Sequence, residues 1–207
     1  MAVALAPFLG SWTVMMAAMM LPSATPMILL HRRGFAGPAR VRSEIRTGVF
    51  VGAYLLVWAA TGVGVWIASR LVDSFLPTAA RPFGVAAILL FAGVYEFTPA
   101  KSACLRVCRS PIDFLMTHWH RGLAGEFRLG LEHGVYCLGC CWALMAVFVG
   151  AGGMGLLWAA IIALAVLVQK VWSQGLVFGR VIGAMLIGGA VLVAALPDLA
   201  QSMAGTM

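Results

Sequence analysis

Six long apolar segments, separated by short polar stretches, run through the 207 residues of the chain. A helix that rises about 1.5 Å per residue needs roughly 20 apolar residues to cross about 30 Å of hydrocarbon. The pattern therefore predicts an all-α membrane protein, a bundle of about six transmembrane helices that forms one domain over Met1–Met207. The predicted spans are Ala6–Leu30, Thr47–Leu71, Pro82–Pro99, Leu129–Ala151, Met154–Gln169 and Val181–Leu196.

Prolines and loop lengths add detail to this bundle. Pro22 and Pro26 predict a kink in the first span, because proline removes a helical hydrogen bond and clashes with the preceding turn. The third and fifth spans are short, so we expect their ends to lie in the membrane interface. The tight loop Ala151–Gly153 makes spans four and five an antiparallel pair, and the long loop Ala100–Arg128 is expected to be helical and interfacial.

The composition agrees with a membrane setting. Hydrophobic residues make up 62% of the chain and charged residues only 10%, whereas a soluble domain carries about 25% charged residues. The net charge of +7 comes from short clusters between apolar segments, which indicates loop topology rather than a surface for nucleic acid. No A-x-A-like cleavage site follows the first apolar segment, so we expect that segment to be retained.

Basic residues gather in alternate loops. Twelve of the fourteen lie in the first, third and fifth loops, and only Arg70 and Arg81 lie on the opposite side. The positive-inside rule makes the basic loops cytoplasmic, so both termini are expected outside. The twelve residues are Arg32, Arg33, Arg40, Arg42, Arg46, Lys101, Arg106, Arg109, Arg121, Arg128, Lys170 and Arg180.

The segment E-H-G-V-Y-C-L-G-C-C-W-A-L-M carries the strongest chemical signal. Residues three and four apart share one face of a helix, so one stripe carries His133, Cys137, Cys140, Cys141 and Met145. A single buried cysteine is usually a small hydrophobic residue, but helix periodicity alone does not collect five soft ligands. Thiolates, thioethers and imidazoles together suit Cu(I), and zinc or iron to a lesser degree.

A second group of soft donors lies in the first span. Met15 and Met19 share one helix face, and Met16 and Met20 share another. Methionine fills irregular gaps in cores, which is the alternative interpretation for each residue. Their clustering beside a proline kink also fits a metal path, since broken helices expose ligands in transporters.

Two further groups are candidate ligands or charge partners. Cys104 and Cys108 lie four residues apart in the long loop and form either a ligand pair or two reduced bystanders. Glu96 ends the third span and either snorkels to Lys101 or marks a metal pathway. Glu132 is expected at a similar depth to Glu96. Of the remaining positions, Tyr54 and Trp58 are expected to serve packing only, and Gly134 and Gly139 are expected to admit another helix, such as the first span.

The segments M-M-A-A-M-M-L-P-S-A-T-P, Y-E-F-T-P-A-K-S-A-C-L-R-V-C-R-S-P and G-V-Y-C-L-G-C-C-W-A-L-M resemble an uncharacterised bacterial family of predicted metal-binding integral membrane proteins (domain of unknown function 2182). The resemblance covers about Trp12–Lys170 and implies metal binding in a bacterial inner membrane. The chain departs from that family at two positions. The family often has Gln where Glu96 stands, and Glu-Lys where Gln169-Lys170 stands.

Two classes of function follow. The first is an inner-membrane protein that binds or transfers Cu(I) through the cysteine, methionine and histidine cluster, acting with a copper-dependent membrane enzyme or a metallochaperone rather than as an enzyme itself. The alternative is a membrane thiol–disulfide oxidoreductase that uses Cys137 and Cys140 with Cys104 and Cys108. A third, weaker interpretation is a haem site at His31 or His133. We expect the metal site to centre on the helical thiols, with the loop thiols only assisting loading.

Overall fold

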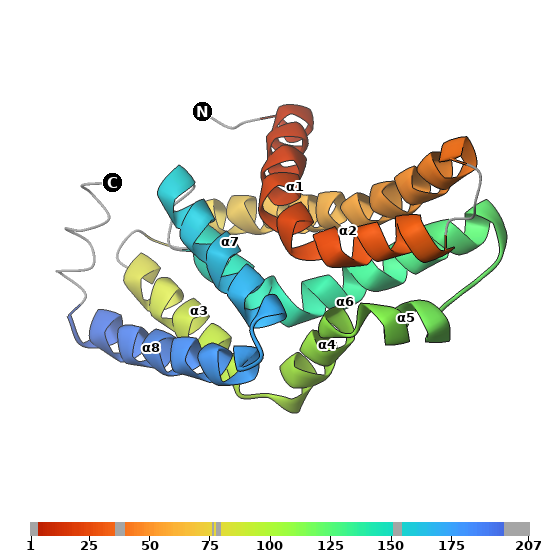
Figure 1. Cartoon of the computed structure of the whole chain (residues 1–207). Coiled ribbons are helices and arrows are strands. Elements are labelled where there is room, and N and C mark those ends of the chain that lie inside the picture. The colour runs from red at the N-terminus through yellow and green to blue at the C-terminus, as the bar shows by residue number, and fades with distance from the viewer. Residues whose placement is uncertain (1–3, 36–39, 76, 78–79, 151–154, 197–207) are drawn as a thin grey trace. The chain divides into compact units, whose positions relative to one another are not determined.

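The computed structural model describes residues 4–35, 40–75, 77, 80–150 and 155–196. Within these residues the regular secondary structure is entirely helical (Figure 1), which confirms the all-α prediction. The loop between predicted spans four and five, with Ala151 and Met154 at its ends, lies outside the described residues, as does the C-terminal end of the chain.

Each predicted apolar segment overlaps an observed helix, although several ends differ by several residues. In chain order they are α1 (Leu5–Leu30), the π-helical η1 (His31–Phe35), α2 (Arg40–Phe75), α3 (Arg81–Glu96), α4 (Pro99–Arg109), α5 (Pro111–Thr117), α6 (Gly122–Gly150), α7 (Leu156–Val171) and α8 (Gly175–Ala195). Both Pro22 and Pro26 lie inside α1. The loop predicted to be helical forms α4 and α5.

Among the described residues, four helical segments are long and apolar enough to cross a membrane, namely Leu5–Gly34, Val41–Val72, Gly122–Gly150 and Gly175–Ala195. Helices α3 and α4 reach that length only as a pair, and the pair is bent by 64°. Helix α7 is apolar but shorter, with 16 residues. Four or five segments therefore have the length of a span, and a sixth span stays a prediction.

The bend between α3 and α4 follows from the sequence Glu96-Phe-Thr-Pro99. Proline disfavours the α conformation of the residue before it, so a helix usually ends there. Thr98 closes the end of α3 by donating its hydroxyl proton to the carbonyl oxygen of Tyr95 at 2.7 Å. Pro99 then opens α4, where a missing N–H costs nothing in the first turn.

The chain forms two compact units. The first comprises Met1–Trp66 and Ala103–Cys140, and the second comprises Ile67–Ser102 and Cys141–Met207. The first unit has a core to which four helices contribute, and its buried residues are Met27, Phe50, Phe114, Leu115 and Leu129.

Glycines allow α2 and α6 to pack closely in the first unit. A Cβ at Gly130 would lie 2.2 Å from the carbonyl oxygen of Phe50, and one at Gly134 would lie 2.8 Å from Cγ2 of Val57. This G-x-x-x-G spacing is a common way for membrane helices to approach one another. Gly134 was expected to face another helix such as the Met-bearing first span, and the structure shows that this neighbour is α2.

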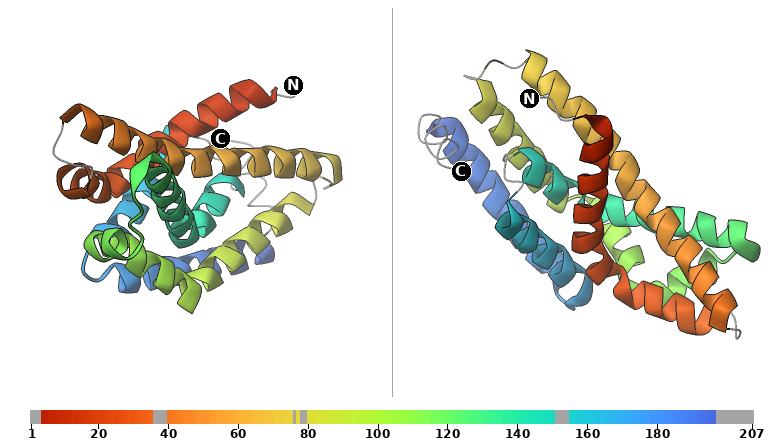
Figure 2. Two further views of the ribbon diagram at one scale, coloured as in Figure 1. Left: turned by 90° about the vertical axis from the view of Figure 1, so that its right-hand side faces the viewer. Right: turned by 90° about the horizontal axis from the view of Figure 1, so that it is seen from above.

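The second unit is organised by the contact of α3 with α8, which lie side by side in Figures 1 and 2. Gly93 and Gly183 meet where these helices cross, because a Cβ at Gly183 would lie 2.9 Å from the carbonyl oxygen of Gly93. The expectation that the glycines of the last span serve packing holds for Gly183.

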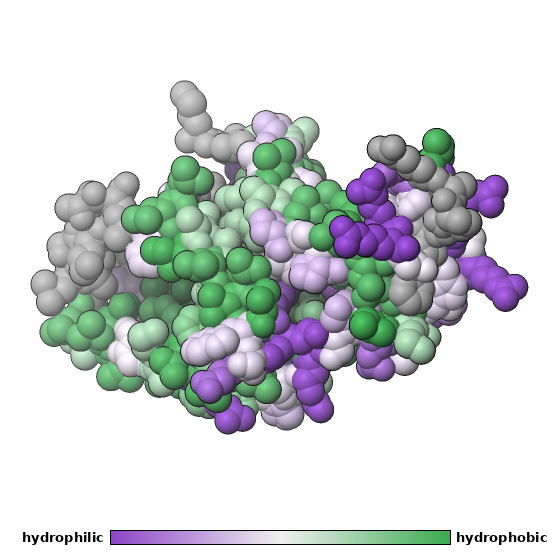
Figure 3. All heavy atoms as spheres, in the orientation of Figure 1, coloured by the Kyte–Doolittle hydropathy of each residue, from purple (hydrophilic) through white to green (hydrophobic). Residues whose placement is uncertain are grey.

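Much of the surface is hydrophobic, as Figure 3 shows for one face. Large apolar side chains such as Leu156, at 87% exposure, and Phe75, at 77%, project outward. Exposed apolar surface of this extent marks contact with a partner or a membrane. Together with the helix lengths, it is consistent with a membrane protein.

Candidate metal site

The thiol stripe lies along α6 and is buried. Cys137, Cys140 and Cys141 have 0%, 2% and 1% exposure, and Met145 one turn further has 5%. The Cys140 thiol donates to the carbonyl oxygen of Cys137 at 3.1 Å, a local bond within one helical turn. The stripe therefore places soft donors away from water, where a hydrated metal ion would have to lose its water ligands to bind.

Tyr54 of α2 reaches this stripe. Its hydroxyl lies 3.2 Å from Sγ of Cys137, within hydrogen-bonding distance, and the whole side chain is buried. This residue was expected to serve packing only, and that expectation missed its contact with a thiol. The contact depends on the close packing of α2 at Gly134, since a Cβ there would meet the Tyr54 carbonyl oxygen at 3.4 Å.

Cys104 of α4 also belongs to this part of the molecule. A Cβ at Gly139 would lie only 2.7 Å from Sγ of Cys104, so the thiol occupies the space that glycine leaves open on α6. Gly139 directly precedes Cys140, so the Cys104 thiol packs beside the thiol stripe. Cys108 lies one turn further along α4 and is partly buried. The structure therefore brings Cys104 to the thiol stripe.

His133 sits in an aromatic surround one turn before Cys137. Its ring centroid lies 5.9 Å from that of Phe50, 5.6 Å from that of Tyr54 and 5.4 Å from that of Phe114. The imidazole is 2% exposed. These aromatic rings surround the imidazole. A metal-ligand role for His133 remains a prediction.

The predicted acidic ligands have partners of their own. Glu132 accepts a hydrogen bond from Nε of Arg128 at 2.8 Å on the same helix. Glu96 forms an ion pair with Lys101, whose Nζ lies 2.5 Å from Oε1. The alternative pairing of Glu96 with Lys101 is thus the one observed, and the pair is buried rather than snorkelling to the surface.

Gln169 completes the Glu96 site within the second unit. Lys101 Nζ donates to Oε1 of Gln169 at 2.8 Å as well as to Glu96, so both side chains bond one ammonium group. An exchange of Glu and Gln between these positions therefore keeps one carboxylate on Lys101.

The methionines of α1 are mostly buried. Met16, Met19 and Met20 have 0%, 4% and 0% exposure, and Met15 is partly buried. Burial agrees both with core packing and with a metal path, so these thioethers stay predicted ligands. Among the described residues, no three His, Cys, Asp or Glu side chains are arranged to hold a metal ion. A metal ion at the thiols would therefore take its third ligand from a thioether, or from a thiol that a small rearrangement brings closer.

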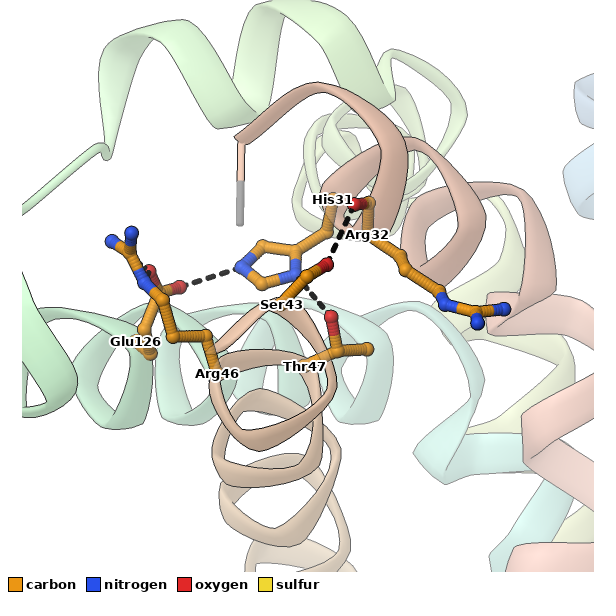
Figure 4. A network of polar contacts seen from close by, with 6 residues as sticks. All are labelled: His31, Arg32, Ser43, Arg46, Thr47 and Glu126. Carbon is orange, nitrogen blue, oxygen red and sulfur yellow. Dashed lines mark hydrogen bonds and ion pairs between the residues drawn. The ribbon is translucent and has the colours of Figure 1, made fainter. Parts of the chain in front are cut away.

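A buried polar network at the start of η1 was not expected from the sequence (Figure 4). His31 Nε2 lies 2.5 Å from Oε2 of Glu126, and Nδ1 lies 3.2 Å from Oγ1 of Thr47. Arg46 donates through Nε to Oε1 of the same glutamate at 2.7 Å. Both ring nitrogens of His31 have protein partners, which argues against a haem ligand there. Glu126 lies seven residues before His133, on the same face of α6, and this spacing was the available sequence signal.

Comparison with known proteins adds one family. The PpoB2 family model, described as a copper chaperone, matches residues 9–193. The matched range includes all five cysteines and runs from α1 into α8. Neither the curated proteins nor the solved structures contain a match to the chain.

Proposed function

Because the chain belongs to the PpoB2 family, which is described as a copper chaperone, we propose that it binds Cu(I) in a membrane through its buried thiols and passes the ion to a partner. The observation that carries the proposal is the burial of Cys137 and Cys140 with Cys104 packed against the same helix turn. Soft sulfur donors favour Cu(I) over the harder divalent ions. Zinc and iron are the alternative cargoes.

Within this proposal Cys137 and Cys140 form the central pair. Cys104, which packs beside Gly139, supplies a third sulfur from α4 after a small rearrangement, and Cys141 and Met145 extend the donors along α6. The buried thioethers Met16, Met19 and Met20 of α1 are the proposed soft ligands from outside α6, while Met15 is less buried. A metal ion held by neutral thioethers and a small number of thiolates keeps a low charge, which favours its stay in an apolar environment.

We propose that the ion enters from the face that carries the basic loops. Cys108 lies nearer the end of α4 than Cys104, so a cargo ion could pass from Cys108 to Cys104 and then to the thiols of α6. In this proposal the protein resides in the bacterial inner membrane with both termini in the periplasm. The donor or recipient is a metallochaperone or a copper-dependent membrane enzyme.

The approach of Cys104 to Cys140 also favours a second candidate, the thiol–disulfide oxidoreductase. A disulfide between α4 and α6 would need these two thiols close together, and the packing of Cys104 beside Gly139, the residue before Cys140, supports that. Against this candidate, the thiols lie in apolar surroundings, whereas reactive cysteines usually lie beside a cation that stabilises the thiolate. Mass spectrometry of the protein purified without reductant separates the two, because a Cys104–Cys140 crosslink without bound copper would favour redox chemistry.

The direct test is the copper content of the purified protein. We expect stoichiometric copper after anaerobic loading with Cu(I) and washing, and loss of that copper in the Cys137→Ala/Cys140→Ala variant. Met16→Leu/Met20→Leu tests the thioethers, with the exposed Met116→Leu and Met185→Leu as matched controls. Copper retained in full by the double cysteine variant would exclude the α6 thiols as the site.

A further inference from the structure

Gln169 of α7 carries a buried amide group. The side chain is 2% exposed, and within the described part of the chain its Nε2 has no hydrogen-bond partner. The orientation of the amide follows from Lys101, because the ammonium group donates and must therefore meet the oxygen Oε1, at 2.8 Å. The NH2 group lies on the other side of the amide carbon. Burying a donor without an acceptor is costly, so this nitrogen calls for an acceptor.

Two glycines of α8 face the Glu96 side chain, and one of them also faces the amide. A Cβ at Gly179 would lie 3.5 Å from Gln169 Nε2 and 2.8 Å from Oε2 of Glu96. A Cβ at Gly183, one turn further, would lie 2.8 Å from Cβ of the same glutamate. All these residues belong to the second unit. An amide donor from α7 and a carboxylate oxygen from α3 thus approach the same glycine of α8.

The two polar groups at Gly179 need different partners. The NH2 group of Gln169 donates hydrogen bonds, whereas a carboxylate oxygen of Glu96 accepts them. An anion would face the carboxylate, and a cation would face the amide hydrogens. Water both accepts and donates, and buried waters typically make about three hydrogen bonds to groups of this kind. The pair of groups therefore selects water over an ion.

We propose that a water molecule is bound beside Gly179, where it accepts a hydrogen bond from Gln169 Nε2 and donates one to Glu96 Oε2. The other oxygen of Glu96, Oε1, is bonded to Lys101, so the water solvates a buried ion pair. Additional hydrogen bonds of this kind are what make a buried ion pair tolerable in apolar surroundings. The site lies within the second unit and does not depend on copper binding.

The amide of Gln169 can be observed directly by NMR. The chain contains three glutamines, Gln169, Gln174 and Gln201, and no asparagine, so the 15N-labelled protein gives only three side-chain NH2 pairs. The full-length protein in detergent micelles is used, and Gln169→Glu identifies the Gln169 pair by removing it. A bound water gives cross-peaks of opposite sign in laboratory-frame and rotating-frame Overhauser spectra, unlike bulk water. We expect this signature at Gln169 and not at the exposed Gln174.

Two substitutions at Gly179 form a matched pair, because Gly179→Ala and Gly179→Ser add the same Cβ and only serine adds a hydroxyl. Both should displace the water and abolish the cross-peak of Gln169. The serine hydroxyl can take the place of the water between the amide and the carboxylate. We therefore expect the thermal unfolding midpoint of Gly179→Ala to lie roughly 2–4 °C below that of Gly179→Ser. Gly188→Ala on the same helix, where an added Cβ meets nothing within 4 Å, should keep the cross-peak.

Three results would overturn the proposal. The first is a water signal at Gln169 with the same signs as that of Gln174, which would mean contact with bulk water only. The second is a bound-water signature that persists in Gly179→Ala. The third is an equal unfolding midpoint for the alanine and serine variants, because the hydroxyl would then replace no hydrogen-bonding partner. The wild-type spectrum decides the question by itself if a Gly179 variant fails to fold.

Discussion

The Cys104 thiol of α4 occupies the space beside Gly139 of α6, where a Cβ would lie 2.7 Å from its sulfur. This relationship links a cysteine of the long loop to the helix that carries three others. It distinguishes the two loop cysteines, because the Cys104 sulfur packs against Gly139 and Cys108 lies one turn further along α4.

The first prediction concerns this contact. Gly139→Ala should displace the Cys104 sulfur and lower copper retention several-fold, while the helix itself gains up to about 1 kcal/mol from the loss of glycine. Gly52→Ala on α2, where an added Cβ meets nothing within 4 Å, is the control. The measurement is copper per protein after equal loading and washing. Unchanged retention in Gly139→Ala would show that Cys104 is not a ligand.

The second prediction separates the two loop cysteines. Cys104→Ala should reduce the amount of copper held at equilibrium, whereas Cys108→Ala should slow loading and leave the final amount unchanged. Cu(I) uptake followed over time by competition with a coloured chelator gives both quantities. Equal losses of bound copper at equilibrium in the two variants would contradict the different roles proposed for Cys104 and Cys108.

The third prediction concerns Tyr54. Tyr54→Phe removes a hydroxyl that lies 3.2 Å from Cys137 Sγ, and a hydrogen bond contributes about 1 kcal/mol net, so we expect Cu(I) affinity to fall about fivefold. Tyr136→Phe on α6, whose ring packs against Phe114, is the matched control. An affinity equal to that of the wild type would mean that the hydroxyl does not position the thiol.

The fourth prediction concerns the buried charge in the second unit. Glu96→Gln leaves the Lys101 ammonium without its carboxylate, and breaking a buried ion pair in this way costs about 3–5 kcal/mol. The thermal unfolding midpoint in detergent should therefore fall. The double variant Glu96→Gln/Gln169→Glu should restore it, because both positions bond Lys101 Nζ.

Copper binding provides the contrast in the same variants. If Glu96 only pairs with Lys101, copper retention should match the wild type in every variant that folds. A loss of copper in the restored double variant would instead make Glu96 a ligand, as the sequence first suggested.

The fifth prediction concerns topology. Reporter fusions at Gly37 and Gly122 should give a cytoplasmic signal and one at Ala204 a periplasmic signal, because basic loops stay inside. A cytoplasmic signal at Ala204 would mean that the number of spans is odd.

Hydropathy was enough to locate the long helices of this chain. A long run of apolar residues forms a helix because its backbone must satisfy its own hydrogen bonds away from water. The predicted start of span two at Thr47 and of span four at Leu129 came later than the helices begin, at Arg40 and Gly122. The helices continue past the apolar run because charged residues such as Arg46 and Glu126 bond one another there.

Helix periodicity likewise predicted that Cys137, Cys140 and Cys141 share a buried face. It did not predict Tyr54 or Cys104 as neighbours, since those contacts depend on which helices approach Gly134 and Gly139. A glycine indicates that another helix can approach closely at that position. The amino-acid sequence does not identify which helix it is. The pairing of His31 with Glu126 was missed for the same reason, because 95 residues separate them.

The complete burial of Cys137 affects timing as well as affinity. A chelator in water cannot touch a sulfur with no exposed surface. If Cys137 holds the cargo ion as proposed, exchange of the ion therefore waits for the surrounding packing to open. The residence time of the ion would then depend on how often α4 and its neighbours separate, in addition to the strength of the metal–sulfur bonds. A partner that promotes this opening would accelerate release without binding copper more tightly than the thiols do.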